Sequence, residues 1–469
     1  MGKSFETIDD RGFALPLSAE QISRSVARQA DAAILKSGPG FGDLGRYCLF
    51  AMKPRAVFEG VGSSWRLSDS WPGARPESSL GALEALRVLL RQTRTAGSPD
   101  LIFQGGWIGY LGYDLAPLLE KLPRRHAADG VSPDLYLAYH DTFAIYDRTT
   151  GELRVIATDA FGEGEQARKR RLDAFTQLAE VPVEDSDTGG AMVQHPPASE
   201  FTPDEYCAAV ARILEYIRAG DIFQANFAHR FAAAFTGHVE HLFERAVERS
   251  PAPFGALLRH NDWAVISTSP ERYLLVEERN VETRPIKGTR PRGRDPIHDL
   301  LLRRELTTSR KDHAELAMIV DLERNDLGRV CQFGSIKVDQ HARIESFSNV
   351  HHLVSTVTGK LRDDADLVDL IAAAFPGGSI TGAPKIRAMQ IIDELERCRR
   401  GVYTGAIGYI SNHGRADFNI AIRTMIVEGG QVHYHVGGGI VADSDPLTEY
   451  RETLAKGRRM REMLLGEPE

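Results

Sequence analysis

The sequence predicts an α+β protein built on large antiparallel β-sheets. Helical and strand patterns mix along its 469 residues without the regular βαβ repeat of a parallel sheet. A hairpin is evident near the C-terminus, where residues 419–427 and 431–436 have strand patterns on either side of Glu428-Gly429-Gly430. The composition, 42% hydrophobic and 26% charged, is typical of a globular chain.

Composition and charge also exclude several classes of protein. No apolar run approaches the roughly 18 residues of a membrane-spanning helix, and the N-terminus has no signal core, so we expect a cytoplasmic protein with no membrane partner. The net charge of −8 makes the chain a poor nucleic-acid binder. The four cysteines are scattered without CxxC spacing, which indicates neither a zinc site nor a disulfide framework.

Residues 181–201 form the clearest break in the pattern. They are rich in Pro, Gly, Asp and Ser and lack periodicity, so we interpret them as a linker or an exposed excursion. The break separates an N-terminal region, 1–180, from a C-terminal region, 202–469. In the first region three glycines recur every third residue, which favours close backbone packing over nucleotide binding: Gly106, Gly109 and Gly112.

The C-terminal region opens with a helix signal. Thr202-Pro203-Asp204-Glu205 is a capping box with proline at the first helical position, and Gly220 can end the helix. A strand pattern follows. Its two faces are predicted to carry Phe223, Phe227 and Phe231 on one side, and Ile222, Gln224 and Asn226 on the other.

Lys287 is the first candidate for chemistry. It lies in TRPIKGTRPRGR, residues 283–294, where Gly288 leaves the amine uncrowded and two prolines stiffen the chain. A lysine held against apolar surface has a depressed pKa and can act as a nucleophile. These residues alone favour a simpler interpretation, a basic surface loop or a phosphate contact made by Arg290, Arg292 and Arg294.

Carboxylates gather in two further segments. Residues 445–458 predict a helix behind Pro446 that places Glu449, Glu452 and Lys456 on one face, suitable for Mg²⁺ and an anionic substrate. The alternative is a solvated Glu452–Lys456 pair worth about 0.3–0.5 kcal/mol. Glu315 heads an apolar helical run in residues 313–329, where it needs a partner such as a metal, or simply favours the helix dipole.

Two glycine-rich turns and one arginine are candidates for binding an anionic ligand. The glycine-rich turns 376–387 and 436–442 offer backbone amides that can receive an anion, although loops of this kind are common. Arg423 falls within the strand pattern 419–427, on the face opposite the isoleucines. It can clamp a carboxylate bidentately, or lie on a solvated face.

Taken together and in this order, these segments resemble the chorismate-utilising enzymes. The resembling strings are PIKGTRPRG, AELAMIVDLERNDLGR, VHHLVSTVTGKL, PGGSITGAPKIRAM, GVYTGAIGYIS and DPLTEYRETLAKG, which fall within residues 200–460. Weaker similarity runs through the first half, as in FQGGWIGYLGYD. The resemblance implies an α/β sandwich of two large, mainly antiparallel sheets flanked by helices, with the site in the cleft between the sheets.

Two positions separate the reactions within this family. Its hydrolytic members have a lysine base where this chain has Gln224, which favours amination here. Its anthranilate synthases usually read PIAGT where this chain reads PIKGT, so Lys287 indicates the aminodeoxychorismate synthase branch. The resemblance then implies that Lys287 attacks C2 of chorismate as the C4 hydroxyl leaves, and that ammonia enters at C4 and displaces the lysine.

The resemblance also assigns roles to other residues. Glu271 in SPERYL matches the general acid/base. Glu315 and Glu452 match the Mg²⁺ ligands, with Glu449 as a nearby second carboxylate. The positions that match contacts to substrate are Arg423, Tyr409, Gly437, Gly438, Gly439, Lys456, His352, Ser379 and Gln224.

Partners and alternatives follow from what the sequence lacks. It carries neither a glutaminase nor a lyase segment, so ammonia is expected from a separate glutamine amidotransferase subunit or from solution, and para-aminobenzoate for folate needs another enzyme. Ile34-Leu35-Lys36-Ser37 stands where the anthranilate branch reads LLES, which argues against feedback by tryptophan. The alternatives are an anthranilate synthase component I with an unusual lysine and, remotely, a non-catalytic polyanion-binding protein.

Overall fold

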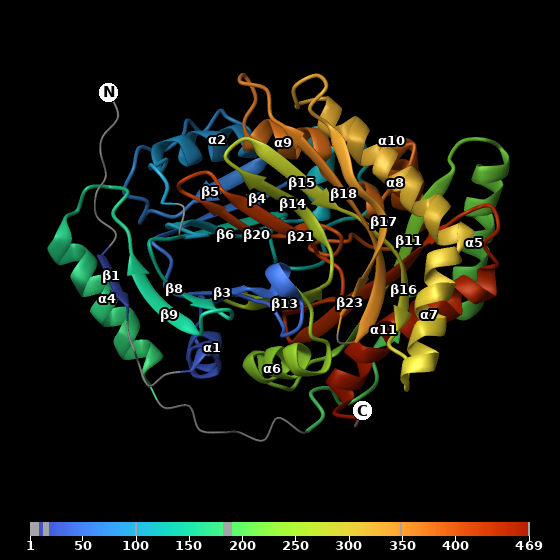
Figure 1. The fold of residues 1–469 in the computed structure, drawn as a ribbon, viewed down its shortest axis with the longest axis horizontal. Coiled ribbons are helices and arrows are strands. Elements are labelled where there is room, and N and C mark those ends of the chain that lie inside the picture. The colour runs from blue at the N-terminus through green and yellow to red at the C-terminus, as the bar shows by residue number, and fades with distance from the viewer. Residues whose placement is uncertain (1–8, 13–17, 99–100, 182–189, 348, 468–469) are drawn as a thin grey trace.

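A computed structural model describes residues 9–12, 18–98, 101–181, 190–347 and 349–467. Its described residues form one sheet of 12 strands and another of 11, and helices flank the pair (Figure 1). The named strand pairs are antiparallel. The prediction of an α+β sandwich of two large antiparallel sheets is therefore confirmed.

The first sheet draws strands from both sides of the break at residues 181–201. Its order is β1 (Asp9–Gly12), β9 (Glu152–Ala157), β8 (Thr142–Asp147), β3 (Tyr47–Ala51), β2 (Ala33–Lys36), β12 (Phe254–His260), β13 (Trp263–Ser269), β22 (Thr424–Glu428), β23 (Gln431–Ile440), β11 (Gln224–Ala234) and β10 (Ala198–Ser199), with β19 (Gly382–Ala383) also paired to β11.

The second sheet is mixed in the same way. Its order is β16 (Ile286–Pro291), β18 (Val350–Lys360), β15 (Asn280–Arg284), β14 (Arg272–Glu277), β21 (Ala416–Ile420), β20 (Ala406–Ser411), β6 (Gly106–Leu111), β7 (Leu135–His140), β4 (Ala56–Val61) and β5 (Ser64–Leu67), with β17 (Lys337–Ser346) paired to β18. In each sheet the N-terminal strands therefore form one block and the C-terminal strands another, and the two blocks meet at the β2–β12 pair in the first sheet and at the β6–β20 pair in the second.

Helices cover the outer faces of the sandwich. α1 (Ala19–Ala27), α4 (Glu165–Ala179), α6 (Val239–Arg249) and α11 (Pro446–Leu465) pack on the first sheet, with α1 and α6 below it and α4 at its left in Figure 1. The others are α2 (Ala82–Gln92), α3 (Ala116–Leu119), α5 (Pro203–Arg218), α7 (Pro296–Thr308), α8 (Arg310–Gly328), α9 (Leu367–Ala374) and α10 (Lys385–Leu395), with short 3₁₀ turns η1 (Gly42–Gly45), η2 (Tyr113–Leu115) and η3 (Gly378–Ile380).

One core lies between the two sheets. It joins residues of both, among them Trp263 and Val265 on β13, Tyr110 on β6 and Ile407 on β20. Gly109 on β6 belongs to this architecture, because a Cβ at that position would overlap the carbonyl oxygen of Tyr136. Close backbone packing, predicted from the glycine spacing, is confirmed at Gly109.

Several predicted elements form as expected. Thr202 and Glu205 make the reciprocal capping box of α5, and residues 385–395 and 446–465 are helical. The turn at Glu428-Gly429-Gly430 joins β22 to β23, with both glycines at positive φ. Phe223 departs from its predicted face, because it lies outside β11 and its side chain is exposed.

Two predictions need correction. Residues 419–427 are not one strand, since β21 ends at Ile420 and β22 begins at Thr424. Arg423 lies in the bend between them, with φ at +50°. Lys287 and its neighbours do not form a surface loop but belong to the edge strand β16.

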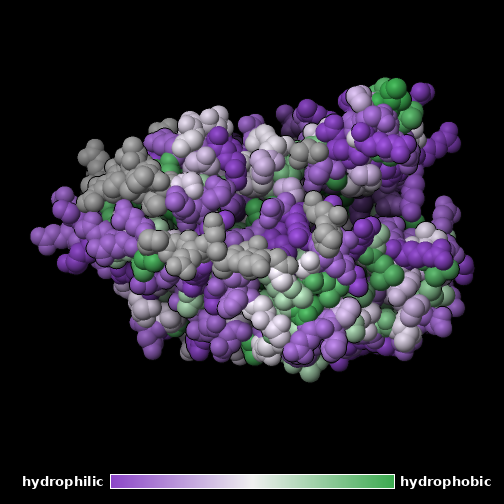
Figure 2. All heavy atoms as spheres, turned by 90° about the horizontal axis from the view of Figure 1, so that it is seen from below, coloured by the Kyte–Doolittle hydropathy of each residue, from purple (hydrophilic) through white to green (hydrophobic). Residues whose placement is uncertain are grey.

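The segment 181–201 is described only in part, because residues 182–189 lie outside the described ranges. In the described portion Met192 and Val193 are buried in the core of the first sheet. No helix of the described chain is long and apolar enough to cross a bilayer. The face in Figure 2 is predominantly hydrophilic, with apolar groups in small separate patches.

Candidate active site

The predicted site residues converge from both sheets and from three helical elements. β16 carries Lys287, the segment between β13 and β14 carries Glu271, and η3 carries Ser379. Opposite them, β23 carries the glycine run 437–439, backed by α11. The sandwich therefore assembles residues that lie more than 200 positions apart in the chain.

Lys287 is presented by a β-bulge. The register of β16 against β18 shifts between Ile286 and Thr289, so Lys287 and Gly288 leave the regular ladder. A bulge of this kind re-aims a side chain. Gly288 has φ at +80°, and a Cβ there would press on Leu306 and Asp312, so the bulge requires glycine.

The Lys287 amine lies among groups of both charges. Its Nζ donates to the carbonyl oxygen of Ser379 at 3.1 Å. Burial lowers the pKa of Lys287, while the nearby carboxylates of Glu271 and Glu315 oppose the shift. The lowered pKa increases the fraction of neutral amine, which is the nucleophilic form.

Glu271 is the carboxyl group whose charge has the largest effect on the pKa of the Lys287 amine. It is buried, and its Oε1 accepts a long hydrogen bond, 3.4 Å, from the backbone N–H of Ile286. Burial raises the pKa of Glu271, against the effects of Ser379 and Lys287. A raised pKa increases the protonated fraction of the carboxyl, which is the form that a general acid needs.

Three further carboxylates belong to this group: Glu315 and Glu452 act on the pKa of Lys287, and Glu449 acts on the pKa of Glu315. Burial raises the pKa of Glu315, and Glu449 adds to the shift. Burial alone would raise the pKa of Glu452, but the ammonium groups of Lys456, Lys311 and Lys287 lower it. Lys456 lies 2.8 Å from Glu452 and also donates to the carbonyl oxygen of Gly437.

These carboxylates suit a hard cation by their oxygen chemistry. The like charges of Glu315 and Glu449 raise a pKa in a way that a divalent ion would relieve. Among the described residues no group of three or more His, Cys, Asp or Glu side chains is arranged to hold a metal by itself. Mg²⁺ commonly takes only one or two protein carboxylates and fills its shell with substrate oxygens and water, so the donor set fits.

Arg423 is the clearest anion-binding group. Burial lowers the pKa of its guanidinium, and among the described residues that group has neither a hydrogen bond nor an ion pair. The bend at residues 421–423 places it beside the open edge of β23, because pairing between β22 and β23 ends at Tyr434. The charge of Arg423 also helps burial to lower the pKa of His352, to about 3.

The glycine run of β23 borders the same space. Gly438 faces α11, because a Cβ on it would stand 3.4 Å from a carboxylate oxygen of Glu449 and 3.6 Å from Nζ of Lys456. A Cβ on Gly439 would meet the side-chain amide of Gln224. Glycine at these positions keeps the backbone accessible to a ligand.

Unpartnered buried polar atoms line this space. Both amide atoms of Gln224, the carboxamide oxygen of Asn226 and the hydroxyl of Ser379 are buried without a hydrogen-bond partner. Such atoms cost roughly 1–3 kcal/mol each when left unsatisfied. Their concentration next to Lys287 indicates a ligand that supplies the missing partners.

His352 and Tyr409, both predicted to contact the substrate, lie in different parts of the structure. His352 on β18 is hydrogen-bonded through Nδ1 to the Thr289 hydroxyl at 2.8 Å, next to the bulge. Tyr409 lies instead in the core between the sheets, where its hydroxyl accepts from Nε of Arg415 at 2.9 Å. No described contact joins Tyr409 to Lys287 or Arg423.

Sequence reasoning missed three residues that support the site. The amide of Asn226 donates to the Ser379 carbonyl, the acceptor of Lys287, at 3.5 Å. Arg400 is buried and donates to the carbonyl oxygens of Asn226 and Ile380, and Glu396 neutralises it at 2.7 Å. The spacing of Glu396 and Arg400, i and i+4, was visible in the sequence, but their burial was not.

The arrangement gathers groups suited to a small anionic substrate. It combines an amine whose pKa is lowered, a carboxyl whose pKa is raised, a guanidinium unpaired among the described residues and carboxylates whose oxygens suit a cation. The model of the chorismate binding enzyme family matches residues 43–462, so the chain belongs to that family.

Relatives and a solved structure agree with this assignment. The chain is 43% identical over 395 residues to anthranilate synthase component 1 1 of Haloarcula marismortui, covering 81% of this chain and 80% of that protein. It is 43% identical over 362 residues to aminodeoxychorismate synthase component 1 of Salmonella typhimurium, covering 77% of each. Anthranilate synthase component I from Streptococcus pneumoniae superimposes with a TM-score of 0.79 at 29% identity, covering 89% of this chain and 92% of that one.

Proposed function

We propose that this chorismate-utilising enzyme is an aminodeoxychorismate synthase component I. It would aminate chorismate at C4 to give 4-amino-4-deoxychorismate, a precursor of para-aminobenzoate and folate. The observation that carries the proposal is Lys287, which leaves the regular strand ladder at the bulge beside Gly288 and whose pKa burial lowers. Relatives with both names are equally similar to the chain, so this residue carries the distinction.

The first chemical step would be attack by Lys287. The neutral amine forms a bond from Nζ to C2 of chorismate, the ring double bonds shift, and the C4–O bond breaks. Glu271 donates its proton to the departing hydroxyl, which leaves as water, and the amine loses a proton. General acid catalysis of this kind contributes typically about 10²–10⁴ in rate.

The second step would return the enzyme to its starting state. Ammonia forms a bond to C4, the double bonds shift back, and the C2–N bond to Lys287 breaks. The Glu271 carboxylate takes a proton from the incoming ammonia, and Lys287 recovers its proton as it leaves. Two moderate substitutions thus replace one difficult displacement.

Other residues would position the substrate. Arg423 would pair with a substrate carboxylate, and the open edge of β23 at Gly437–Gly439 would bind a second. Mg²⁺ held by Glu315 and Glu452, with Glu449 nearby, would neutralise the ring carboxylate. Ammonia would come from a separate glutamine amidotransferase subunit, as the name component 1 of the relatives suggests.

Product identity tests the proposal. The pure chain is incubated with chorismate, Mg²⁺ and ammonium at mildly alkaline pH, and the product is identified by mass. We expect a product that keeps the enolpyruvyl group and yields para-aminobenzoate only after a lyase is added. Anthranilate with pyruvate would instead support the second candidate, anthranilate synthase component I, which the Haloarcula relative favours.

A covalent test isolates the role of Lys287. Without ammonium, the protein is expected to gain the mass of one chorismate less one water, on the peptide that contains Lys287. The matched control is Lys287→Ala, which creates the PIAGT string of the anthranilate branch and should carry no adduct. An unmodified wild-type protein that still turns over would refute the covalent route.

A further inference from the structure

A second enclosed space lies outside the cleft. It is a cavity of about 260 Å³ between α10 and the residues that follow β6. Apolar side chains form much of its wall, including Pro117, Leu122, Met389 and Ile392. None of the site residues predicted from the sequence lines it, although Glu396 and Arg400, which support the candidate active site, form part of its wall. Its size is near the lower limit of small-molecule pockets, about 300 Å³.

Most charged groups that line this cavity satisfy one another. Arg399 lies 3.4 Å from Asp114 and also pairs with Asp134. The Glu396–Arg400 pair closes the inner wall toward β11. The remaining acid, Asp393, lies 3.5 Å from Nε of Arg125. These pairs leave no free negative charge among them for a cationic ligand.

Tyr113 is the exception deep in the cavity. Only 8% of the residue is exposed, and its hydroxyl is buried without a hydrogen-bond partner. The Arg400 guanidinium stacks over its ring at 4.6 Å, which holds the ring in place. A buried hydroxyl costs roughly 1–3 kcal/mol unless something bonds to it. The position calls for a polar group at the inner end of a ligand.

Arg124 is the exception at the mouth. Its side chain is exposed, and among the described residues it has no hydrogen bond or ion pair. A guanidinium with this freedom binds carboxylates readily. The free charge of the cavity is therefore positive, and it is carried by an exposed side chain, whereas the unpartnered hydroxyl is buried.

We propose that this cavity binds a small aromatic carboxylate with a hydrogen-bonding substituent at the far end of its ring. The carboxylate would pair with Arg124, the ring would pack between Met389, Ile392 and Leu122, and the substituent would bond to Tyr113. The proposal concerns a site separate from the cleft, and it does not depend on which chorismate reaction the cleft performs.

Calorimetry with three matched probes tests the ligand class. We expect 4-hydroxybenzoate to bind the full chain at one site. Benzoate, which lacks the far hydroxyl, should bind about fivefold more weakly. 4-Hydroxybenzylamine, with the opposite charge, should bind at least about tenfold more weakly. Equal binding of the amine, or no binding of any probe at millimolar concentration, would overturn the proposal.

Variants test the location. Tyr113→Phe should weaken 4-hydroxybenzoate about fivefold while leaving benzoate unchanged. Arg124→Gln should weaken both acids about tenfold. Ala128→Trp, at an exposed position of the lining, should block entry. Arg423→Gln, in the cleft, should change nothing. Binding that is lost only in Arg423→Gln would show that the probe occupies the cleft and would refute the second site.

Discussion

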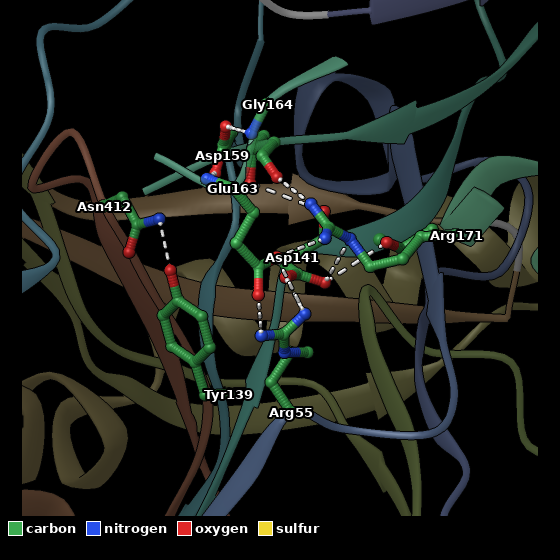
Figure 3. Close-up of polar contacts among 10 residues, drawn as sticks. Arg55, Tyr139, Asp141, Asp159, Glu163, Gly164, Arg171 and Asn412 are labelled. Carbon is green, nitrogen blue, oxygen red and sulfur yellow. Dashed lines mark hydrogen bonds and ion pairs between the residues drawn. The ribbon is translucent and has the colours of Figure 1, made fainter. Parts of the chain in front are cut away.

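Two groups of charged residues in this protein have opposite character. In the N-terminal half, Arg55, Asp141, Glu163 and Arg171 pair with one another where the chain crosses between the sheets (Figure 3). Nearby, Asp159 accepts from the backbone N–H groups of Glu163 and Gly164, and Tyr139 accepts from Asn412. Every charge of this network faces an opposite charge.

The cleft shows the reverse. Arg423 has no partner among the described residues, and the amide of Gln224 and the hydroxyl of Ser379 are buried without one. Beside them, burial raises the pKa of Glu315, and the charge of Glu449 adds to that shift. A folded chain tolerates such groups when a ligand completes them. The comparison teaches that in this molecule burial without pairing, rather than charge itself, marks the site.

Glu271→Gln should have the largest effect. The amide cannot donate the proton that the leaving hydroxyl needs, so kcat is expected to fall by about 10²–10⁴. The melting temperature should change little, because no ion pair is broken. Steady-state kinetics and thermal unfolding measure the two effects. The control is Glu282→Gln, a carboxylate already paired with Arg272, which should leave kcat unchanged.

Asp141→Asn should affect stability and spare activity. It leaves Arg55 and Arg171 with less neutralising charge in a buried site, at a cost of about 3 kcal/mol in the free energy of unfolding. Denaturant titration measures this loss, and kcat/KM at a temperature well below unfolding should be unchanged. The double variant Asp141→Asn/Arg171→Met should recover part of the loss. A large fall in kcat/KM would contradict the contrast drawn between the two regions.

Arg423→Gln should lower activity without lowering stability, the reverse of the effect expected for Asp141→Asn. Loss of its carboxylate contact is expected to lower kcat/KM for chorismate about 10–100-fold, mainly through KM. The free energy of unfolding should stay constant or rise, because an unpaired buried charge is removed. Arg423→Lys keeps the charge without the planar fork and should recover activity only in part. A destabilised Arg423→Gln protein with normal KM would place Arg423 in the scaffold.

Lys287→Met should have the smallest effect on stability, with a defined pH dependence. Because burial lowers the pKa of Lys287, the unfolded chain binds this proton more tightly than the folded chain below the ordinary lysine pKa. The wild type therefore gains stability from this group as pH rises, and the methionine variant does not. We expect the variant to melt about 1–3 °C higher at pH 7, with a difference that shrinks toward pH 10. A difference independent of pH would contradict a lowered pKa.

Local signals in the sequence anticipated much of the fold. The Thr202–Glu205 capping box and the glycine turn at 429–430 act over three or four residues, so their outcome needed no tertiary information. The break at Arg423 was missed because alternating isoleucines continue through it, while the chain must bend there to leave one sheet for the other. Arg423 adopts a φ of +50° because the chain crosses between the sheets there, not because arginine itself favours a positive φ.

Some residues of the candidate site were also indicated by local sequence, whereas others depend on tertiary contacts. The strings around Lys287, Glu271 and Glu452 indicated the family, because residue identity at fixed spacing is a property of sequence. Tyr409 was assigned from such a string, yet the strand period turns its side chain into the core between the sheets. Asn226, Glu396 and Arg400 were not identified as site residues from the sequence, since their role depends on contacts between β11, η3 and the chain around α10.

The sequence by itself determined the class of fold, the family and the identity of the reactive groups. Only the tertiary structure decided which groups are neutral, which are paired and which are left open. The reason is physical: a pKa and a hydrogen bond depend on burial and on neighbours distant in the chain, as for Lys287 and the Ser379 carbonyl 92 residues away. The same amino acid types are paired at Asp141 and unsatisfied in the cleft, and no spacing along the chain distinguishes the two.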